Sequence, residues 1–290
     1  MQKPWLQKLR MKLLFQKSLR SSTRNLGNGK IAAETALLST DSEMAARIVV
    51  AADSFIIEQA GWESLRSDSH YVTVGRKIEA LVGVQAYFGV AAALARAFSG
   101  QEAGPQRALF AECIKAVIQS ECYVYQKRGF SDSKVFQEDW DMNHPNSCRY
   151  YSHLDQVARR WFDYIEEEPR TESLFHRHKT IAVWISELNV LHTTASFLDS
   201  FHALGLQASC DTAGNILAFN GSFLRAPDAI CFGTARLPAN LIGRNLREIS
   251  RKELNRELGG SEGCAHLLDL GQELLLDLQK SLNSFDATSL

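Results

Sequence analysis

The feature that most constrains the fold is a strict two-residue alternation that begins after Pro169. From Phe175 to Ile185, one set of alternate residues is Phe, Arg, Lys, Ile, Val and Ile, and the other is His, His, Thr, Ala and Trp. Successive side chains of a strand point to opposite faces of a sheet, so a period of two predicts a β-strand. Further strand-like segments follow, with a turn at residues 211–215. The sequence therefore predicts an antiparallel sheet over Leu174–Leu224.

Four of the eight histidines lie on this predicted sheet, and they indicate two kinds of chemistry. His176 and His178 are two residues apart on one strand, about 6–7 Å between their α carbons, so both could bind one metal ion. The alternative is that they are surface histidines among charged neighbours. Asp199 lies three residues before His202. A carboxylate that orients an imidazole makes a general base near neutral pH, so Asp199 and His202 are predicted to be catalytic.

The region before the sheet is predicted to be helical. Thr40-Asp-Ser-Glu43 has the spacing of a helix-capping box, and apolar residues recur at helical spacing up to Ile165. A helix that starts near Gln106 carries Glu121 at a position where an apolar residue is expected. A buried ionised acid without a partner is costly, so Glu121 should bind a cation, a metal ion or a proton. Glu121 is therefore assigned a catalytic role. The alternative is that Glu121 lies at the edge of the apolar stripe and pairs with a Lys or Arg.

The first 38 residues are predicted to form a basic flexible arm. Residues 1–30 contain eight Lys or Arg, and no acid occurs before Glu34. Four apolar residues from Trp5 to Leu13 are spaced for one face of a helix, so a basic amphipathic helix is an alternative. The arm is expected to dock a partner or to remain disordered.

Composition excludes several classes of protein. The formal net charge of -1 argues against a general nucleic-acid binder. No apolar run reaches the roughly 18 residues that a membrane helix needs. The six cysteines form no Cys-x-x-Cys pair, which favours reduced thiols in a cytoplasmic protein over a disulfide framework or a zinc ribbon. We expect a cytoplasmic homo-oligomer with no nucleic-acid partner and no integral membrane segment.

These patterns predict an α+β fold in which a helical N-terminal region packs against a C-terminal antiparallel β-sheet with terminal helices. The predicted regions are the arm at 1–38, the helical region at 39–170, and the sheet plus C-terminal helices at 171–290. A pocket for a small molecule is expected between the helix that carries Glu121 and the sheet that carries His178, Asp199 and His202.

Several side chains are predicted to surround this pocket. Arg149, Tyr150 and Tyr151 directly precede a predicted helix, where they can lie over the pocket. Tyr151 is assigned a catalytic role, and Arg149, Tyr150, Tyr123 and Arg225 are assigned to substrate binding. Aromatic side chains suit an aromatic ligand, although tyrosines also commonly serve as packing residues.

Three motifs in the C-terminal region resemble those of a known bacterial family. They are Phe223-Leu-Arg-Ala-Pro-Asp-Ala-Ile-Cys231, Leu241-Ile-Gly243 and Leu258-Gly-Gly-Ser-Glu-Gly-Cys-Ala-His-Leu267. Over roughly residues 171–285 the chain resembles domain of unknown function family 2889, with Ala265 where the family usually has Thr. The family's Asp-Thr-Lys motif is similar to Asp199-Ser200, and its His-x-Arg-x-Ile motif to the stretch that begins at His176. The resemblance implies a strand-rich first half for this region and implies no reaction.

The expected function is a small-molecule enzyme that uses acid–base chemistry. Our first choice is a lyase that acts on an aromatic or polar carbon compound in the catabolism of aromatic compounds. The alternatives are a hydrolase of a small ester or thioester and a non-catalytic ligand-binding or assembly protein. One divalent metal ion, held by His176 and His178, is an optional cofactor.

Overall fold

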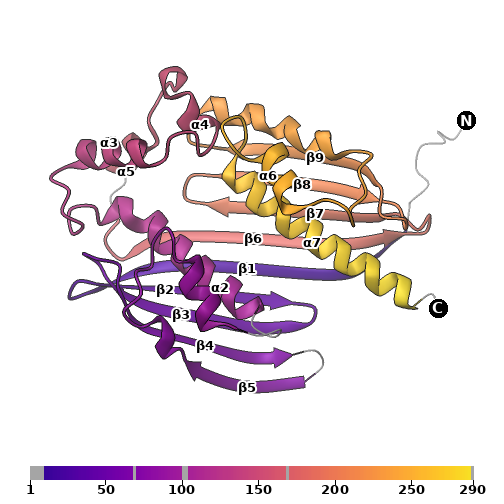
Figure 1. Ribbon diagram of the computed structural model, residues 1–290, viewed down its shortest axis with the longest axis horizontal. Helices are drawn as coiled ribbons and strands as arrows, with labels where there is room; N and C mark the ends of the chain where they lie inside the picture. Colours follow the sequence, from indigo (N-terminus) through magenta and orange to yellow (C-terminus); the bar gives the residue numbers. More distant parts are fainter. Residues whose placement is uncertain (1–9, 68–69, 100–103, 168–169, 289–290) are drawn as a thin grey trace, which may run out of the picture.

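A single nine-stranded antiparallel sheet runs through the computed structural model, which describes residues 10–67, 70–99, 104–167 and 170–288 (Figure 1). The strand order is β5-β4-β3-β2-β1-β6-β7-β8-β9, so the first and sixth strands pair at the centre. The strands are β1 (Met11–Gly27), β2 (Lys30–Ser39), β3 (Ser42–Ala51), β4 (Ile57–Ser67), β5 (His70–Lys77), β6 (Ser173–Ser186), β7 (Leu191–Asp199), β8 (Ala203–Cys210) and β9 (Ile216–Arg225).

One group of helices lies between β5 and β6, and a second group follows β9. Between β5 and β6 lie η1 (Glu79–Leu81), α1 (Ala91–Ala97), α2 (Gly104–Ser120), η3 (Glu121–Tyr123), α3 (Ser133–Asn143), α4 (Arg149–Ser152), η4 (Leu154–Gln156) and α5 (Trp161–Glu167). After β9 come η5 (Ala229–Leu241), α6 (Arg251–Leu258) and α7 (Ala265–Thr288). None of the helices in the described part of the chain has the length and apolarity needed to cross a lipid bilayer.

The N-terminal region consists of strands, so the prediction that it is helical is wrong. β1 and β2 occupy the predicted flexible arm from Met11 onward, and β3 to β5 occupy the start of the predicted helical region. Buried and more exposed residues alternate in β2 and in the second half of β3, which is the period of a strand. Residues 1–9, including three of the four apolar residues of the predicted amphipathic helix, lie outside the described residues.

Two short turns connect the first three strands, and the second of them contains the residues that resemble a helix-capping box. Gly27, Asn28 and Gly29 all have positive φ, and an Asn-Gly pair in this conformation is the strongest short-range hairpin signal. At the next turn, the Ser39 hydroxyl accepts hydrogen bonds from the backbone N–H groups of Asp41 and Ser42. The hydroxyl and carboxylate residues that resemble a capping box therefore belong to a turn between β2 and β3, because Ser and Asp stabilise turns and helix N-termini by similar hydrogen bonds.

The C-terminal sheet agrees with the alternation in the sequence. β6 to β9 cover the predicted range Leu174–Leu224 as a meander of four antiparallel strands. The helix predicted to begin near Gln106 is present as α2, which starts at Gly104. Each half of the molecule is thus a strand meander followed by a long helix, with α2 packed on β1 to β3 and α7 packed on β6 to β8.

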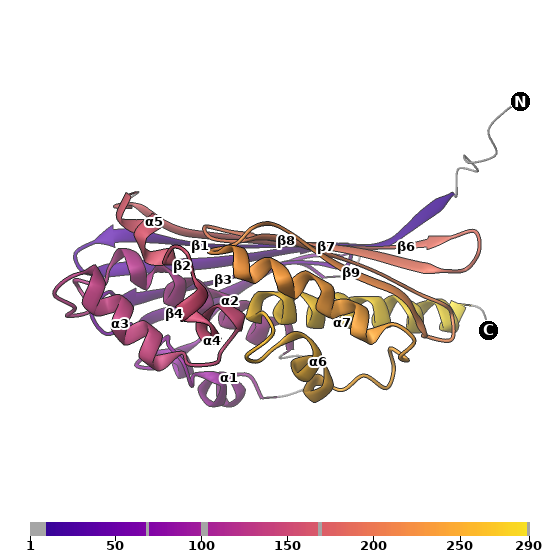
Figure 2. The ribbon, with the colours of Figure 1, turned by 90° about the horizontal axis from the view of Figure 1, so that it is seen from above.

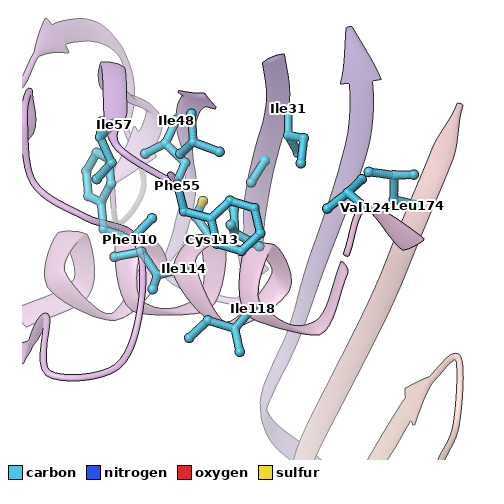
Figure 3. Close-up of a cluster of buried hydrophobic side chains, with 14 of the residues drawn as sticks. Ile31, Ile48, Phe55, Ile57, Phe110, Cys113, Ile114, Ile118, Val124 and Leu174 are labelled. Atoms are coloured by element: carbon cyan, nitrogen blue, oxygen red, sulfur yellow. The ribbon is translucent and has the colours of Figure 1, made fainter. Parts of the chain in front are cut away.

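The long helices α2 and α7, together with α1 and α6, lie on one face of the sheet (Figure 2). Beneath the helices lie two hydrophobic clusters. The first packs α2 and the connecting helices against β1 to β4, with Phe110 and Ile114 facing Ile31 and Ile48 (Figure 3). The second packs α6 and α7 against β6 to β9. Burial of these apolar side chains is the main stabilising contribution for both halves.

A buried ionic network fills the boundary between the two clusters. Lys179 on β6 is 1% exposed, and its Nζ pairs with Glu112 of α2 and with Asp269 and Glu273 of α7. Among the described residues the network contains Lys17, Glu112, Lys115, Arg177, Lys179, Asp269, Glu273, Asp277 and Lys280. The three acids of α7 are spaced four residues apart, which places them on one face of the helix. The network therefore connects α2, α7 and the central strands.

Removing the central cation of this network should destabilise the fold. We expect Lys179→Met to lower the free energy of unfolding by about 3 kcal/mol, because Glu112, Asp269 and Glu273 lose the buried cation that they share. Urea denaturation followed by circular dichroism measures this change. Arg256→Met is a matched control, since Arg256 is 67% exposed and an exposed pair contributes at most about 1 kcal/mol. An effect of Lys179→Met as small as that of the control would contradict the assigned role of the network.

Stability should also depend on acid pH through Glu112. Burial would raise the pKa of this carboxyl, but Lys179, Lys115 and Arg177 favour the charged form and lower it to about 2. An unfolded Glu has a pKa of about 4.3, so the contribution is complete above that pH and is lost as the pH falls toward 2. We expect Glu112→Gln to be less stable than the wild type at pH 7, with a difference that narrows below about pH 4. Urea midpoints measured across this range test the expectation, and a constant difference would contradict it.

Candidate functional site

One end of the boundary between the two halves contains a cavity of about 330 Å³. Its walls come from α2, α3, α4, the start of α5, the turn between β7 and β8, and the first turn of α7. A volume near the lower end of the range for ligand pockets, about 300–1,000 Å³, suits a small molecule. The cavity therefore lies where segments that are far apart in the sequence meet.

A carboxylate and an imidazole are held together in the tight turn that joins β7 to β8. Asp199 Oδ1 accepts hydrogen bonds from the backbone N–H groups of Phe201, at 2.8 Å, and His202, at 2.6 Å. The Nδ1 atom of His202 lies 3.0 Å from the same oxygen. If Nδ1 donates to Asp199, the Nε2 atom of His202 is left as a free acceptor. The turn thus orients the His202 ring, which lines the cavity.

Arg225 supports this turn from outside, and neighbouring groups keep Asp199 ionised. The guanidinium of Arg225 donates hydrogen bonds to the backbone oxygens of Asp199 and His202, so it holds the turn and does not line the cavity. Burial acts to raise the pKa of Asp199, but the charge and hydrogen bond of His202, together with His266 and Arg177, hold it well below its usual value. Asp199 is therefore a carboxylate at neutral pH.

A second imidazole lies against the first. His266, in the first turn of α7, has its ring centroid 3.9 Å from that of His202, and its Nε2 lies 3.9 Å from Asp199 Oδ2. That carboxylate oxygen is buried and has no hydrogen-bond partner among the described residues. Burial and the neighbouring His202 lower the pKa of His266 well below its usual value, so its ring is neutral at physiological pH. The three side chains form the most concentrated acid–base group that borders the cavity.

These three residues also have donor atoms suited to a metal ion. One ligand atom from each of Asp199, His202 and His266 lies within 4.8 Å of the others. Within the described part of the chain, the other such group is Glu112, Asp269 and Glu273, whose carboxylates are already occupied by Lys179 and Lys115.

Aromatic side chains form much of the remaining wall. Trp140 stacks on His144 with ring centroids 4.2 Å apart, and its indole N–H donates to the hydroxyl of Tyr151 at 2.8 Å. The backbone N–H of Trp161 donates to the hydroxyl of Tyr150 at 3.1 Å. Burial raises the pKa of Tyr150 to about 12 and the pKa of Tyr151 well above its usual value. Both phenols therefore stay protonated and keep a proton to donate.

Residues 186–277 match the family described as protein of unknown function (DUF2889). The match confirms the resemblance seen in the sequence motifs. The DUF2889 segment runs from the end of β6 to the middle of α7, so it contains Asp199, His202 and His266. Searches of the curated proteins and of the solved structures gave no significant match.

The structure brings together only some of the residues predicted from the sequence. Asp199 and His202 of the DUF2889 segment adjoin the cavity, and Arg149, Tyr150 and Tyr151 line it from α4. α2 contributes to the wall, as expected, but through residues other than Glu121.

Glu121 and Tyr123 lie away from the cavity. Glu121 is buried, and its carboxylate accepts hydrogen bonds from Arg128 Nε at 2.8 Å and from the Tyr87 hydroxyl at 2.7 Å. This is the alternative of a paired acid, and it explains how a carboxylate can occupy an apolar stripe. The ring of Tyr123 packs under the guanidinium of Arg170.

His176 and His178 lie on the uncovered face of the sheet. Their Nε2 atoms are hydrogen bonded to the hydroxyls of Ser173, at 2.6 Å, and Ser18, at 2.8 Å. They border a shallow groove on that face and belong to neither of the groups that could hold a metal ion. The strand alternation places them opposite Arg177 and Lys179, which point toward the helices.

His266 and Arg177 belong to the site but are not among the site residues predicted from the sequence. The motif that ends in Cys-Ala-His-Leu267 marks the start of α7, and this is the sequence signal that could have indicated His266. Arg177 occupies a strand position among apolar residues, where a buried cation needs a partner. Neither signal reveals that the start of α7 lies beside the β7–β8 turn.

The cysteines of the cavity should be unreactive in the native protein. Burial raises the pKa of Cys264 to about 12 and that of Cys231 to about 11, so both remain thiols at pH 8. We expect iodoacetamide at pH 8 to label these two cysteines slowly in the folded protein and all six cysteines rapidly in urea. Mass spectrometry of peptides measures the labelling, and rapid native labelling of Cys264 would contradict its buried, neutral state.

Proposed function

We propose that the protein is an acid–base enzyme, a lyase that acts on a small aromatic compound. The observation that carries this proposal is the Asp199–His202 pair, with the tilted ring of His266 packed against His202, at the wall of an aromatic cavity. A buried carboxylate that fixes the tautomer of an imidazole is the arrangement of a general base. A base of this kind can remove a proton from a group that is only weakly acidic in water.

In the proposed reaction, Nε2 of His202 removes a proton from a carbon atom of the substrate. The electron pair of that C–H bond forms a double bond while the bond from the neighbouring carbon to the leaving group breaks. The hydroxyl of Tyr151 donates a proton to the leaving group, and proton exchange with solvent then restores His202 and Tyr151. The raised pKa of Tyr151 keeps its proton available until negative charge develops on the leaving group.

The aromatic wall supports the choice of substrate class. Trp140, Tyr150 and Trp161 offer ring faces and edges to a bound ring, and such contacts contribute about 0.5–1.5 kcal/mol each beyond buried area.

The six free cysteines support a cytoplasmic location, where thiols stay reduced. We also propose that the protein acts as a homo-oligomer on a small-molecule substrate.

Replacing the base should abolish turnover while leaving the protein folded. The assay uses a panel of small phenolic compounds that carry a leaving group β to an acidic C–H bond, with products followed by liquid chromatography and mass spectrometry. We expect His202→Ala and Asp199→Asn each to lower kcat/KM by about 10²–10⁴-fold, the usual contribution of general acid–base catalysis.

A histidine on the opposite face provides the matched control. His192 lies on β7 in the same set of alternate residues as the exposed Thr194 and Leu198, and it does not border the cavity. His192→Ala should keep wild-type activity, and thermal melting should confirm that all variants are folded. Full activity in His202→Ala would refute the proposal, whereas tight binding of a panel member without turnover would favour a ligand-binding protein.

A further inference from the structure

The cavity contains an unusual excess of hydrogen-bond donors. Arg149 Nε, Trp161 Nε1 and Arg177 Nε are buried and have no hydrogen-bond partner among the described residues, and all three residues line the cavity. No side-chain oxygen of the lining residues is in that state. A buried donor without an acceptor costs about 1–3 kcal/mol, so three of them around one cavity indicate that a ligand supplies the acceptors.

The charge of the wall points to an anionic acceptor. Lys115, Arg149 and Arg177 line the cavity, whereas Asp269 is the acid that lines it and the Asp199 carboxylate lies against His202 and His266. The pairing of Arg177 is incomplete, since its Nη1 contacts Glu112 at 3.4 Å while its Nε has no partner. A planar guanidinium with free N–H groups is well suited to a carboxylate, which can accept two parallel hydrogen bonds.

The position of Arg177 relates this anion site to the proposed base. Arg177 is 5% exposed, and its charge lowers the pKa of both Asp199 and His266. Arg149 lines the same cavity from α4, where its backbone N–H donates to Gly263 O at 2.8 Å and its Nη1 pairs with Glu262. Two guanidinium groups, one from β6 and one from α4, therefore line one cavity.

We propose that the ligand of this cavity is an aromatic carboxylate. Its carboxylate is held by Arg177 and Arg149, and its ring lies among Trp140, Tyr150 and Trp161. This inference rests on the proposed function for the site and narrows the substrate from an aromatic compound to an aromatic acid.

The test compares two probes that differ only in charge. Isothermal titration calorimetry at pH 7.5 measures the binding of trans-cinnamate and of cinnamamide, its neutral analogue, to the full-length protein. We expect trans-cinnamate to bind at least tenfold more tightly than the amide. Equal or tighter binding of the amide, or no binding of either probe to the folded protein, would overturn the proposal.

Two substitutions test the assigned groups. Arg149→Met and Arg177→Lys should each reduce the affinity for trans-cinnamate about tenfold or more and leave the weaker affinity for cinnamamide unchanged. Arg149 is 26% exposed, so Arg149→Met is expected to fold even if Arg177→Lys does not. Arg256→Met, an exposed arginine of α6, is the control and should keep the full preference for the acid. Retention of that preference in Arg149→Met would count against the site.

The outcome separates this inference from the proposed function. Binding of trans-cinnamate to wild type, together with full turnover in His202→Ala, would support the anion site and refute the proposed base. Loss of turnover in His202→Ala, with no preference for trans-cinnamate over cinnamamide, would support the base and refute the anion site.

Discussion

The ion pairs of Lys179 are the interaction on which the rest of the structure depends. A buried lysine on the central strand β6 contacts carboxylates from α2 and from α7, the two long helices that cover the two halves of the sheet. A desolvated charge is costly unless it is paired with good geometry, so these contacts restrict where both helices can lie. Hydrophobic packing alone would hold each helix on its own strands without specifying their relation to each other.

The position of the candidate site follows from this restriction. Asp269 belongs to the ionic network and lies one turn after His266 in α7. Holding Asp269 against β6 therefore holds His266 beside the turn that carries Asp199 and His202. Arg177 connects the two regions directly, because it contacts Glu112 of the network and also lines the cavity. Preorganisation of this kind places charged and hydrogen-bonding groups before a ligand arrives.

The part of the fold that could be predicted from the sequence is the part with an unambiguous period. From Phe175 to Ile185 the alternation continues for eleven residues, and the strand is present. In the N-terminal half the strands contain many Ala, Ser and Thr residues, so their apolar pattern is weak and a helical period fits nearly as well. The Asn28-Gly29 pair is a local hairpin signal in this region, whereas the basic and apolar pattern that suggests an arm or a helix lies in residues 1–9 and β1.

Within the candidate site, the sequence by itself determined the pairing of Asp199 with His202. Asp199 and His202 are three residues apart in a turn, and that separation suffices to bring a carboxylate to an imidazole. The C-terminal motifs likewise indicated the resemblance that the family model matches over residues 186–277. Only the tertiary structure decided that His266 packs against His202, that Glu121 pairs with Arg128, and that His176 and His178 lie on the other face of the sheet. The physical reason is that these relations depend on how helices pack on strands far away in the sequence, and local periodicity contains no information about that packing.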